Sequence, residues 1–122
     1  MSKFVTIHNL SRLVTPIEAE YCDTALGRMR GLTFRRSLAT GHGMLLVNRR
    51  ENRLEAAIHT LFMNFDLALI WIDHRKRVVD TRLAPCWRPL FVPLHPASHV
   101  LEMGPERLLD FQPGDQLDYL TK

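Results

Sequence analysis

The feature that most constrains this chain is one uninterrupted apolar run, LALIWI, which extends from Leu67 to Ile72. Six residues are few for a helix and far short of the roughly 18 that a membrane-spanning helix needs. Neighbouring residues of a strand point to opposite faces, so a run without polar positions predicts a strand that is buried on both sides. The fold must therefore cover both faces of a sheet.

Further short strands are predicted on either side of this run. Alternating or continuous apolar residues, separated by turn residues, indicate strands at FVTIHNL (4–10), TPIEAEYC (15–22), GMLLV (43–47), LEAAIHTLFM (54–63), RVVDTRL (77–83), HVLEM (99–103) and DQLDYL (115–120). The tetrapeptide DHRK predicts a hairpin turn after the apolar run, and PGD predicts a type II turn before the last strand.

Two short helices are expected. In DTALGRMRG (23–31), Asp23 is suited to cap the helix and Gly31 to end it, and in GPERLLDF (104–111), Pro105 is suited to the first helical position. With 122 residues the chain is expected to form a single domain over 1–122. We expect an α+β, mainly β fold: a small open or closed β-barrel of about seven or eight short strands with two short helices.

The segment APCWRPLFVPLHPASH (84–99) contains four prolines. Proline removes a backbone donor, so this segment is predicted to be a long loop over the surface. Its Trp87 either covers a pocket or partner surface or acts as a lid on the core.

The charge is unevenly distributed along the chain. The net charge is +3, but the stretch from Thr24 to Leu90 has twelve basic and five acidic residues, and the two ends together have four basic and eight acidic. This basic middle fits weak binding of an anionic polymer, or arginines that keep a β-rich surface soluble. Since RMRGLTFRR and NRRENR contain one aromatic residue, Phe34, nucleic-acid binding is not expected.

Cysteine content and the N-terminal residues predict a cytoplasmic protein with reduced thiols. Cys22 and Cys86 are too few for a disulfide-stapled secreted domain, and MSKFVTIHNL lacks the apolar stretch of a signal peptide. The two cysteines form a disulfide only if their Cα atoms lie within about 7 Å. His95 and His99 follow Cys86 by nine residues or more, but no second cysteine or acidic ligand is nearby in sequence, so neither a metal nor a cofactor is expected.

Five blocks in order resemble a known family. They are RGLTFRR, GHGMLLV, IHTLFMNFDLALIWID, RVVDTRLAP and HVLEMGPERLLDFQPGD. Together they are similar to the DUF192 family, which is widespread in bacteria and archaea and named for being uncharacterised. The resemblance covers most of the chain, roughly 21–117. It implies a compact β-rich fold with small helices and no established activity, substrate or cofactor.

The chain departs from this family pattern at one informative position. The matching positions include Arg28, Arg35, His59, Thr60, Met63, Phe65, Asp73, Glu102 and Asp115. Where the family usually has Pro-Ile-Asp or Pro-Leu-Asp after the Met-x-Phe element, this chain reads Asp66, Leu67 and Ala68. Ala68 therefore stands in place of the usual carboxylate, which argues against catalysis unless Asp66 compensates.

The candidate ligand or partner surface comprises Arg28, Arg35, His59, Met63, Asp73 and Trp87. Arg28 and Arg35 flank the end of the predicted first helix, where they bind a carboxylate or phosphate, or pair with a domain carboxylate such as Glu102. His59, in a predicted apolar strand, is either a base or ligand, with Asp66 and Asp73 as nearest carboxylates, or a core histidine bonded to backbone carbonyls.

These residues favour a non-catalytic module that binds a small ligand or a protein partner, in a groove between the arginine-rich helix end and the proline-rich loop. Two alternatives remain at the level of sequence. One is a hydrolase or transferase that uses His59 with a nearby carboxylate, and the other is weak binding of an anionic polymer through the arginine-rich middle.

Overall fold

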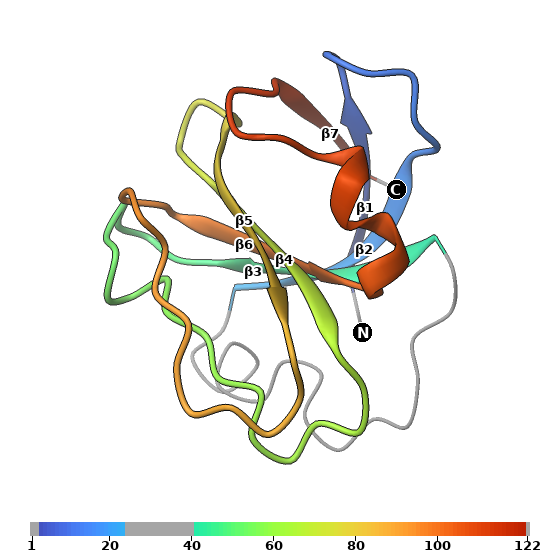
Figure 1. The fold of residues 1–122 in the computed structure, drawn as a ribbon. Coiled ribbons are helices and arrows are strands. Elements are labelled where there is room, and N and C mark those ends of the chain that lie inside the picture. The colour runs from blue at the N-terminus through green and yellow to red at the C-terminus, as the bar shows by residue number, and fades with distance from the viewer. Residues whose placement is uncertain (1–2, 24–40, 122) are drawn as a thin grey trace.

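The apolar run forms the strand β4 (Leu67–Ile72), and all six of its residues are buried, as predicted. In the computed structural model, which describes residues 3–23 and 41–121, β4 lies between two antiparallel neighbours (Figure 1). These neighbours are β5 (Val78–Ala84), reached through the predicted hairpin turn, and β6 (His99–Met103). The strand is therefore interior to the sheet and covered on both faces.

The sheet continues beyond β6 with the remaining strands. They are β3 (His42–Val47), β2 (Ile17–Cys22), β1 (Lys3–Asn9) and β7 (Leu117–Thr121), and the spatial order is β5-β4-β6-β3-β2-β1-β7. All strand pairs are antiparallel except β2 with β3, which run parallel. The sequence predicted a strand at each of these four positions and at β5 and β6, and all six predictions are confirmed.

The sheet curls until its two edge strands meet at one corner. Backbone N–H groups of Val78 and Leu117 donate to the carbonyls of Asp115 and Lys76, at 2.9 and 2.8 Å, and Gly114 donates to the carbonyl of Val78 at 2.8 Å. These bonds join the start of β5 to the segment that leads into β7. The mainly β fold and the number of strands agree with the sequence, and the sheet is a curled half-barrel.

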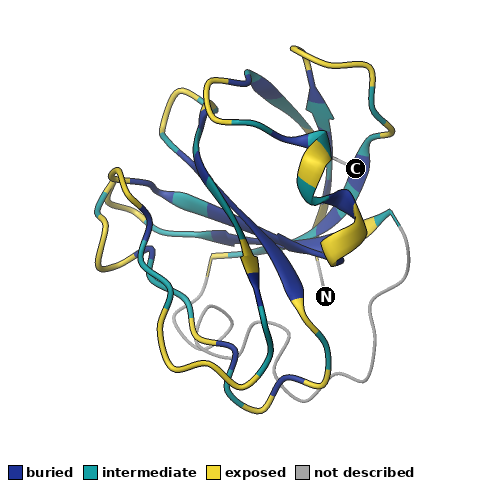
Figure 2. Cartoon of the chain, in the orientation of Figure 1, coloured by how far each residue is buried: buried dark blue, intermediate teal, exposed yellow. Residues whose placement is uncertain are grey.

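Buried residues lie along the central strands of the curled sheet (Figure 2). Their side chains form two cores, one on each face of the sheet. The inner core includes Ile7, Ile17, Leu45, Ile70, Leu101 and Phe111. The outer core includes Met44, Leu46, Met63, Leu69, Trp71 and Val100. Alternate residues of β3, β4 and β6 enter the two cores, which explains why these strands have few polar positions.

The helix predicted from Pro105 is a short 3-10 helix, η1 (Pro105–Asp110), with proline at its start. Its Leu108 packs against the inner core, and in Figure 1 the helix lies over the opening of the curled sheet. The other helix, predicted over 23–31, falls almost entirely outside the described residues. Within the described part of the chain, η1 is the one helical element.

The strand predicted over 54–63 is wrong. These residues form turns and a single antiparallel bridge between Ile58 and Phe91. The apolar residues are needed to cover the outer core rather than to extend the sheet: Ala56 and Met63 are buried there, and the Trp71 Nε1–H donates to the carbonyl of Ala56 at 2.8 Å. An apolar segment that lines a core as a loop has the composition of a strand.

The corner where the edges meet is held by Asp115, in the predicted PGD turn. Its Oδ2 accepts hydrogen bonds from Asn9 Nδ2 at 2.9 Å, Arg12 Nε at 2.7 Å and the Gln112 N–H at 2.9 Å. Burial disfavours the charged form, but these hydrogen bonds outweigh it and lower the pKa of Asp115. Asp115, which matches the family pattern, is therefore a structural residue.

Candidate functional site

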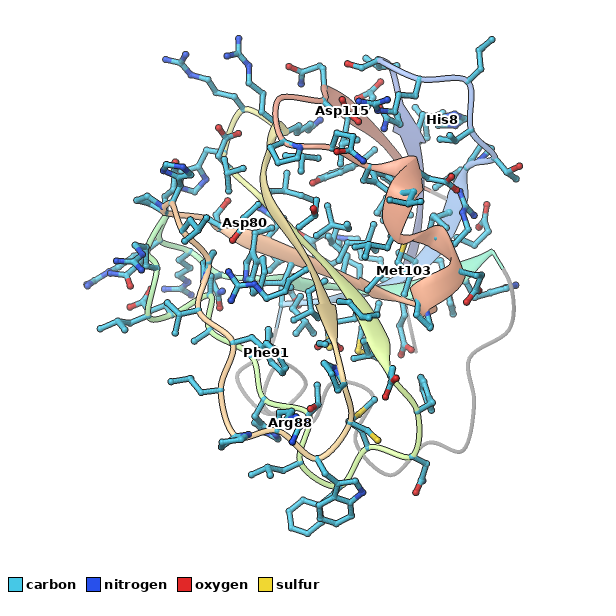
Figure 3. All side chains as sticks on the ribbon, viewed as in Figure 1. His8, Asp80, Arg88, Phe91, Met103 and Asp115 are labelled. Atoms are coloured by element: carbon cyan, nitrogen blue, oxygen red, sulfur yellow. The ribbon has the colours of Figure 1, made fainter. Side chains whose placement is uncertain are left out.

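Two loops that are distant in sequence lie side by side at one end of the β4–β5 hairpin, and we call them the paired loops. They are residues 56–66, which lead into β4, and residues 85–92, which follow β5. The Ile58 N–H donates to the carbonyl of Phe91 at 2.9 Å and the Phe91 N–H returns a bond to Ile58 at 2.7 Å. Figure 3 labels Arg88 and Phe91 along this end of the molecule.

Thr60 is the central residue that joins the paired loops. It is fully buried, and its hydroxyl donates to the carbonyl of Pro85 at 2.6 Å while accepting the N–H of Arg88 at 2.9 Å. Its backbone N–H donates to the carbonyl of Arg88 and its carbonyl accepts the N–H of Trp87, at 2.9 and 2.8 Å. One side chain and one peptide unit thus fix the backbone around Trp87.

Phe62 and Trp87 occupy a backbone conformation that large side chains rarely adopt. Their φ angles are +63° and +61°, in the left-handed region. That conformation costs about 1–2 kcal/mol for each residue, so it persists only because surrounding bonds impose it. The bond from the Trp87 N–H to Thr60 is one of those bonds.

The same two residues place aromatic rings on the surface. Phe62 is 49% and Trp87 55% exposed, and their ring centroids lie 5.2 Å apart in an edge-to-face arrangement. Such pairing is favourable for aromatic rings, but it leaves much of both rings in water. A strained backbone that displays two large aromatic side chains is a feature of binding sites rather than of core packing.

The structure brings three of the six predicted site residues to the paired loops and separates the others. His59, Met63 and Trp87 lie there, whereas Asp73 lies in the β4–β5 turn at the opposite end of the hairpin. Arg28 and Arg35 are outside the described residues, and so is the arginine-rich side of the predicted groove.

His59 is not the buried strand histidine that its apolar neighbours suggested. It is exposed, and its Nδ1 accepts the N–H of Leu61 at 3.2 Å, which places the proton of the neutral ring on Nε2. Within the described residues it has no hydrogen bond to a carboxylate. Asp66 accepts the Cys86 N–H at 2.9 Å, and Asp73 accepts those of Arg75 and Arg77 in its own turn. The carboxylates nearest in sequence are thus occupied with loop structure.

The remaining expectations concern Met63, Trp87, the cysteines and metal binding. Met63 is 2% exposed in the outer core and is a packing residue, and Trp87 projects to the surface instead of forming a lid. Cys22 and Cys86 are not joined in a disulfide, and both pack at the border of the outer core. Among the described residues no group of three or more His, Cys, Asp or Glu is arranged to hold a metal ion.

Sequence reasoning missed Phe62 and the linking role of Thr60. The sequence pattern placed Phe62 at one more apolar position of a predicted strand, and no local sequence signal indicates its left-handed conformation. The pattern PCWRP around Trp87 was the available signal, because prolines on both sides of an aromatic residue indicate a constrained loop.

Thr60→Val should lower the free energy of unfolding by about 2 kcal/mol, because the Pro85 carbonyl and the Arg88 N–H both lose a buried partner. Thr60→Ser keeps the hydroxyl and should cost less than half as much. Urea unfolding of the two variants measures the difference. Equal losses for Val and Ser would show that the hydroxyl is unimportant for joining the loops.

The sequence matches the model of a protein family over residues 6–119, DUF192, described as "Uncharacterized ACR". UPF0127 proteins of Thermococcus gammatolerans and Pyrococcus furiosus are 38% and 31% identical, over 82% and 84% of this chain. The match covers 87% of the Pyrococcus protein but 65% of the Thermococcus protein, so the chain spans about two thirds of that relative's length.

Two solved structures share the fold. One, from Sinorhizobium meliloti 1021, is of a candidate transcription regulator, with a TM-score of 0.83, 21% identity, and coverage of 98% of this chain and 94% of that one. The other is of a protein of unknown function from Novosphingobium aromaticivorans, with a TM-score of 0.78, 22% identity, and coverage of 94% and 83%. No helix in the described ranges is long and apolar enough to cross a membrane. With a family model spanning nearly all of its length, the chain belongs to the DUF192 family, whose relatives are named UPF0127 proteins.

Proposed function

We propose that this chain is a small binding module without catalytic activity, and that its binding surface is the aromatic pair of Phe62 and Trp87 on the paired loops. The observation that carries the proposal is the left-handed backbone of both residues combined with their exposure. The fold sustains a conformational cost at two neighbouring points to hold two apolar rings in water. A ligand or protein surface that covers the rings removes their apolar area from water, and this burial favours binding.

The chemistry around the rings supports binding rather than catalysis. His59, the candidate base, has one ring nitrogen engaged by the Leu61 N–H and no carboxylate bonded to the other within the described residues. Ala68 stands at the family's usual carboxylate position and is buried in the inner core. The partner chemistry that fits the pair is apolar and flat enough to contact two aromatic faces, whether on a small molecule or on a protein.

Trp87→Gly tests this function while avoiding a general loss of stability. Glycine adopts a φ of +61° without strain, so the variant should unfold within about 3 °C of the native chain. A thermal-shift screen of flat, apolar metabolites should yield a saturable stabiliser of the native chain, because a ligand that binds the folded state raises the unfolding temperature by mass action. The same compound should not stabilise Trp87→Gly or Phe62→Ala.

A matched control is Leu109→Ala, which removes another exposed apolar side chain, 78% exposed on η1, away from the paired loops. This variant should keep the full ligand response. Trp87 fluorescence gives a second readout, because Trp71 is fully buried and its emission stays constant. A ligand that stabilises Trp87→Gly as well as the native chain would refute the assignment of the surface.

A further inference from the structure

Three segments converge at the end of the sheet opposite the paired-loop aromatic pair. They are the loop after β3 (48–55), the β4–β5 turn (73–77) and residues 93–98, just before β6. Val47, at the end of β3, and Ile72, at the end of β4, both pair with His99 of β6. The loop after β3 and the β4–β5 turn therefore lie on either side of the start of β6. The N–H of Asn48 donates to the carbonyl of Ser98 at 2.8 Å, and that of Ser98 to the carbonyl of Ile72 at 2.9 Å.

This arrangement gathers arginines from two separate sequence runs. Arg49, Arg50, Arg75 and Arg77, which we call the basic end, are all exposed, and none forms an ion pair within the described ranges. Elsewhere in those ranges, Arg12, Arg82 and Arg107 are each paired with an aspartate. The guanidinium groups of the basic end are therefore available to an outside partner.

Three acidic residues, Glu51, Glu55 and Asp73, lie on the segments that carry the four arginines of the basic end. Asp73 Oδ1 accepts the backbone N–H groups of Arg75 and Arg77, both at 2.9 Å, and Glu51 lies 3.9 Å from His74 Nε2. Burial, followed by the charges of His74 and Lys76, lowers the pKa of His99 to about 4. A positive electrostatic potential at this end of the sheet is consistent with that direction.

Two exposed leucines lie on the segments that form the same end. Leu54 is 77% and Leu94 64% exposed. The backbone beside them is fixed, because Arg53 Nε donates to the carbonyl of Pro93 at 2.9 Å and Asn52 Oδ1 accepts the Leu54 N–H at 2.8 Å. A rigid surface with both cations and apolar side chains is thus ready before any partner arrives.

We propose that the basic end, with Leu54 and Leu94, binds an acidic segment of a partner protein that carries apolar side chains among its carboxylates. Carboxylates satisfy guanidinium groups in bidentate geometry, and apolar side chains of the segment cover the leucines. This surface is separate from the aromatic pair of Phe62 and Trp87, so either can fail without the other.

The spacing of the loops and their composition favour a protein segment over nucleic acid. The ends of β3 and β4 are two strand spacings apart, about 10 Å, which an extended chain crosses in about three residues. Acidic side chains about three positions apart can therefore reach both loops. Residues 48–55 and 73–77 contain no Phe, Tyr or Trp on which bases could stack, and the leucines offer nothing to a phosphate backbone.

The test uses the full chain and two synthetic fluorescent peptides of equal length and charge. One alternates glutamate pairs with leucine, and the other replaces each leucine with serine. Binding is followed by fluorescence anisotropy from 25 to 300 mM NaCl. The leucine peptide should bind at least threefold more tightly than the serine peptide, and both affinities should fall as salt rises. A 20-base-pair DNA duplex and vesicles with anionic lipid are tested as competitors.

Variants separate the charged from the apolar contribution. Arg50→Gln and Arg75→Gln should each weaken both peptides about threefold to fivefold, whereas Arg88→Gln, which removes the same charge at the paired loops, should have no effect beyond twofold. Leu54→Ala should weaken the leucine peptide and leave the serine peptide unchanged. Leu109→Ala is its matched control.

The results decide between partners. A leucine preference that is lost in Leu54→Ala, together with arginine dependence confined to the basic end, supports an acidic protein segment. Four results would overturn the proposal. Two concern the peptides: no binding at 25 mM NaCl, or equal affinity for both. The other two are stronger binding of the duplex or the vesicles than of either peptide, and equal effects of Arg50→Gln and Arg88→Gln. All substituted side chains are exposed, and a urea midpoint within 0.3 M of the native value, a margin of roughly half a kcal/mol, verifies the fold of each variant.

Discussion

Replacing Trp71 with alanine should lower the free energy of unfolding by about 4 kcal/mol. The side chain is fully buried in the outer core, and its removal leaves a large cavity that close-packed neighbours fill only in part. It also removes the bond from Nε1–H to the carbonyl of Ala56, by which the loop of residues 56–66 is attached to the sheet. Urea unfolding followed by circular dichroism measures the loss.

A second variant separates the two contributions. Trp71→Phe retains most of the apolar contact but not the N–H donor, so the buried Ala56 carbonyl loses its partner. We expect a loss of about 2 kcal/mol, roughly half that of alanine. A loss of under 1 kcal/mol in Trp71→Ala would mean that the paired loops do not depend on the outer core for their position.

The stability of the chain should fall as the pH drops from about 6.5 to 4 because of His99. Burial first, and then the charges of His74 and Lys76, lower its pKa from 6.5 to about 4, against a weaker opposing effect of Asp73. In that interval the unfolded chain binds a proton that the folded chain does not, so folding becomes less favourable. The full stability is present above pH 6.5, and the loss, at most about 3 kcal/mol, is complete near pH 4.

His99→Gln removes the titrating group and should flatten this part of the pH profile. The ring of His99 contacts Tyr119 with centroids 5.9 Å apart, and its Nδ1 lies 2.7 Å from the Ser98 hydroxyl, so the variant also loses some stability at pH 8. The slope rather than the absolute value is therefore the test. His42→Gln, at an exposed position, is the control. An NMR titration that finds the His99 midpoint near 6.5 would contradict the prediction.

Much of the fold could be read from the sequence because strand periodicity reflects which face each residue occupies. The apolar run of β4 predicted burial on both faces, and the alternation of IEAEYC predicted the half-buried β2. The segment 54–63 misled because composition reports burial and does not distinguish a strand from a loop that covers a core. The parallel pairing of β2 with β3 depends on tertiary contacts and has no local signature.

The candidate sites were predictable to a smaller extent. Trp87 was identified from its proline-rich surroundings, but its partner Phe62 was not, because left-handed backbone at a bulky residue is imposed by tertiary bonds such as those of Thr60. The apolar neighbours of His59 predicted a place in the core. In the structure the segment forms turns instead of a strand, and His59 is exposed. The basic end could not be recognised, because two arginine runs about 25 residues apart meet only once β3, β6 and β4 are assembled.

The pairing of β1 with β7 has a consequence for the order in which the chain folds. Val5 lies opposite Thr121, so the two partners of this ladder are separated by almost the whole sequence. Contacts of such long range form slowly, because a long loop must close before they contribute. While β7 is absent, one edge of β1 exposes unpaired backbone groups of the kind that join other chains. The refolding yield should therefore fall with protein concentration, even though the finished sheet covers that edge.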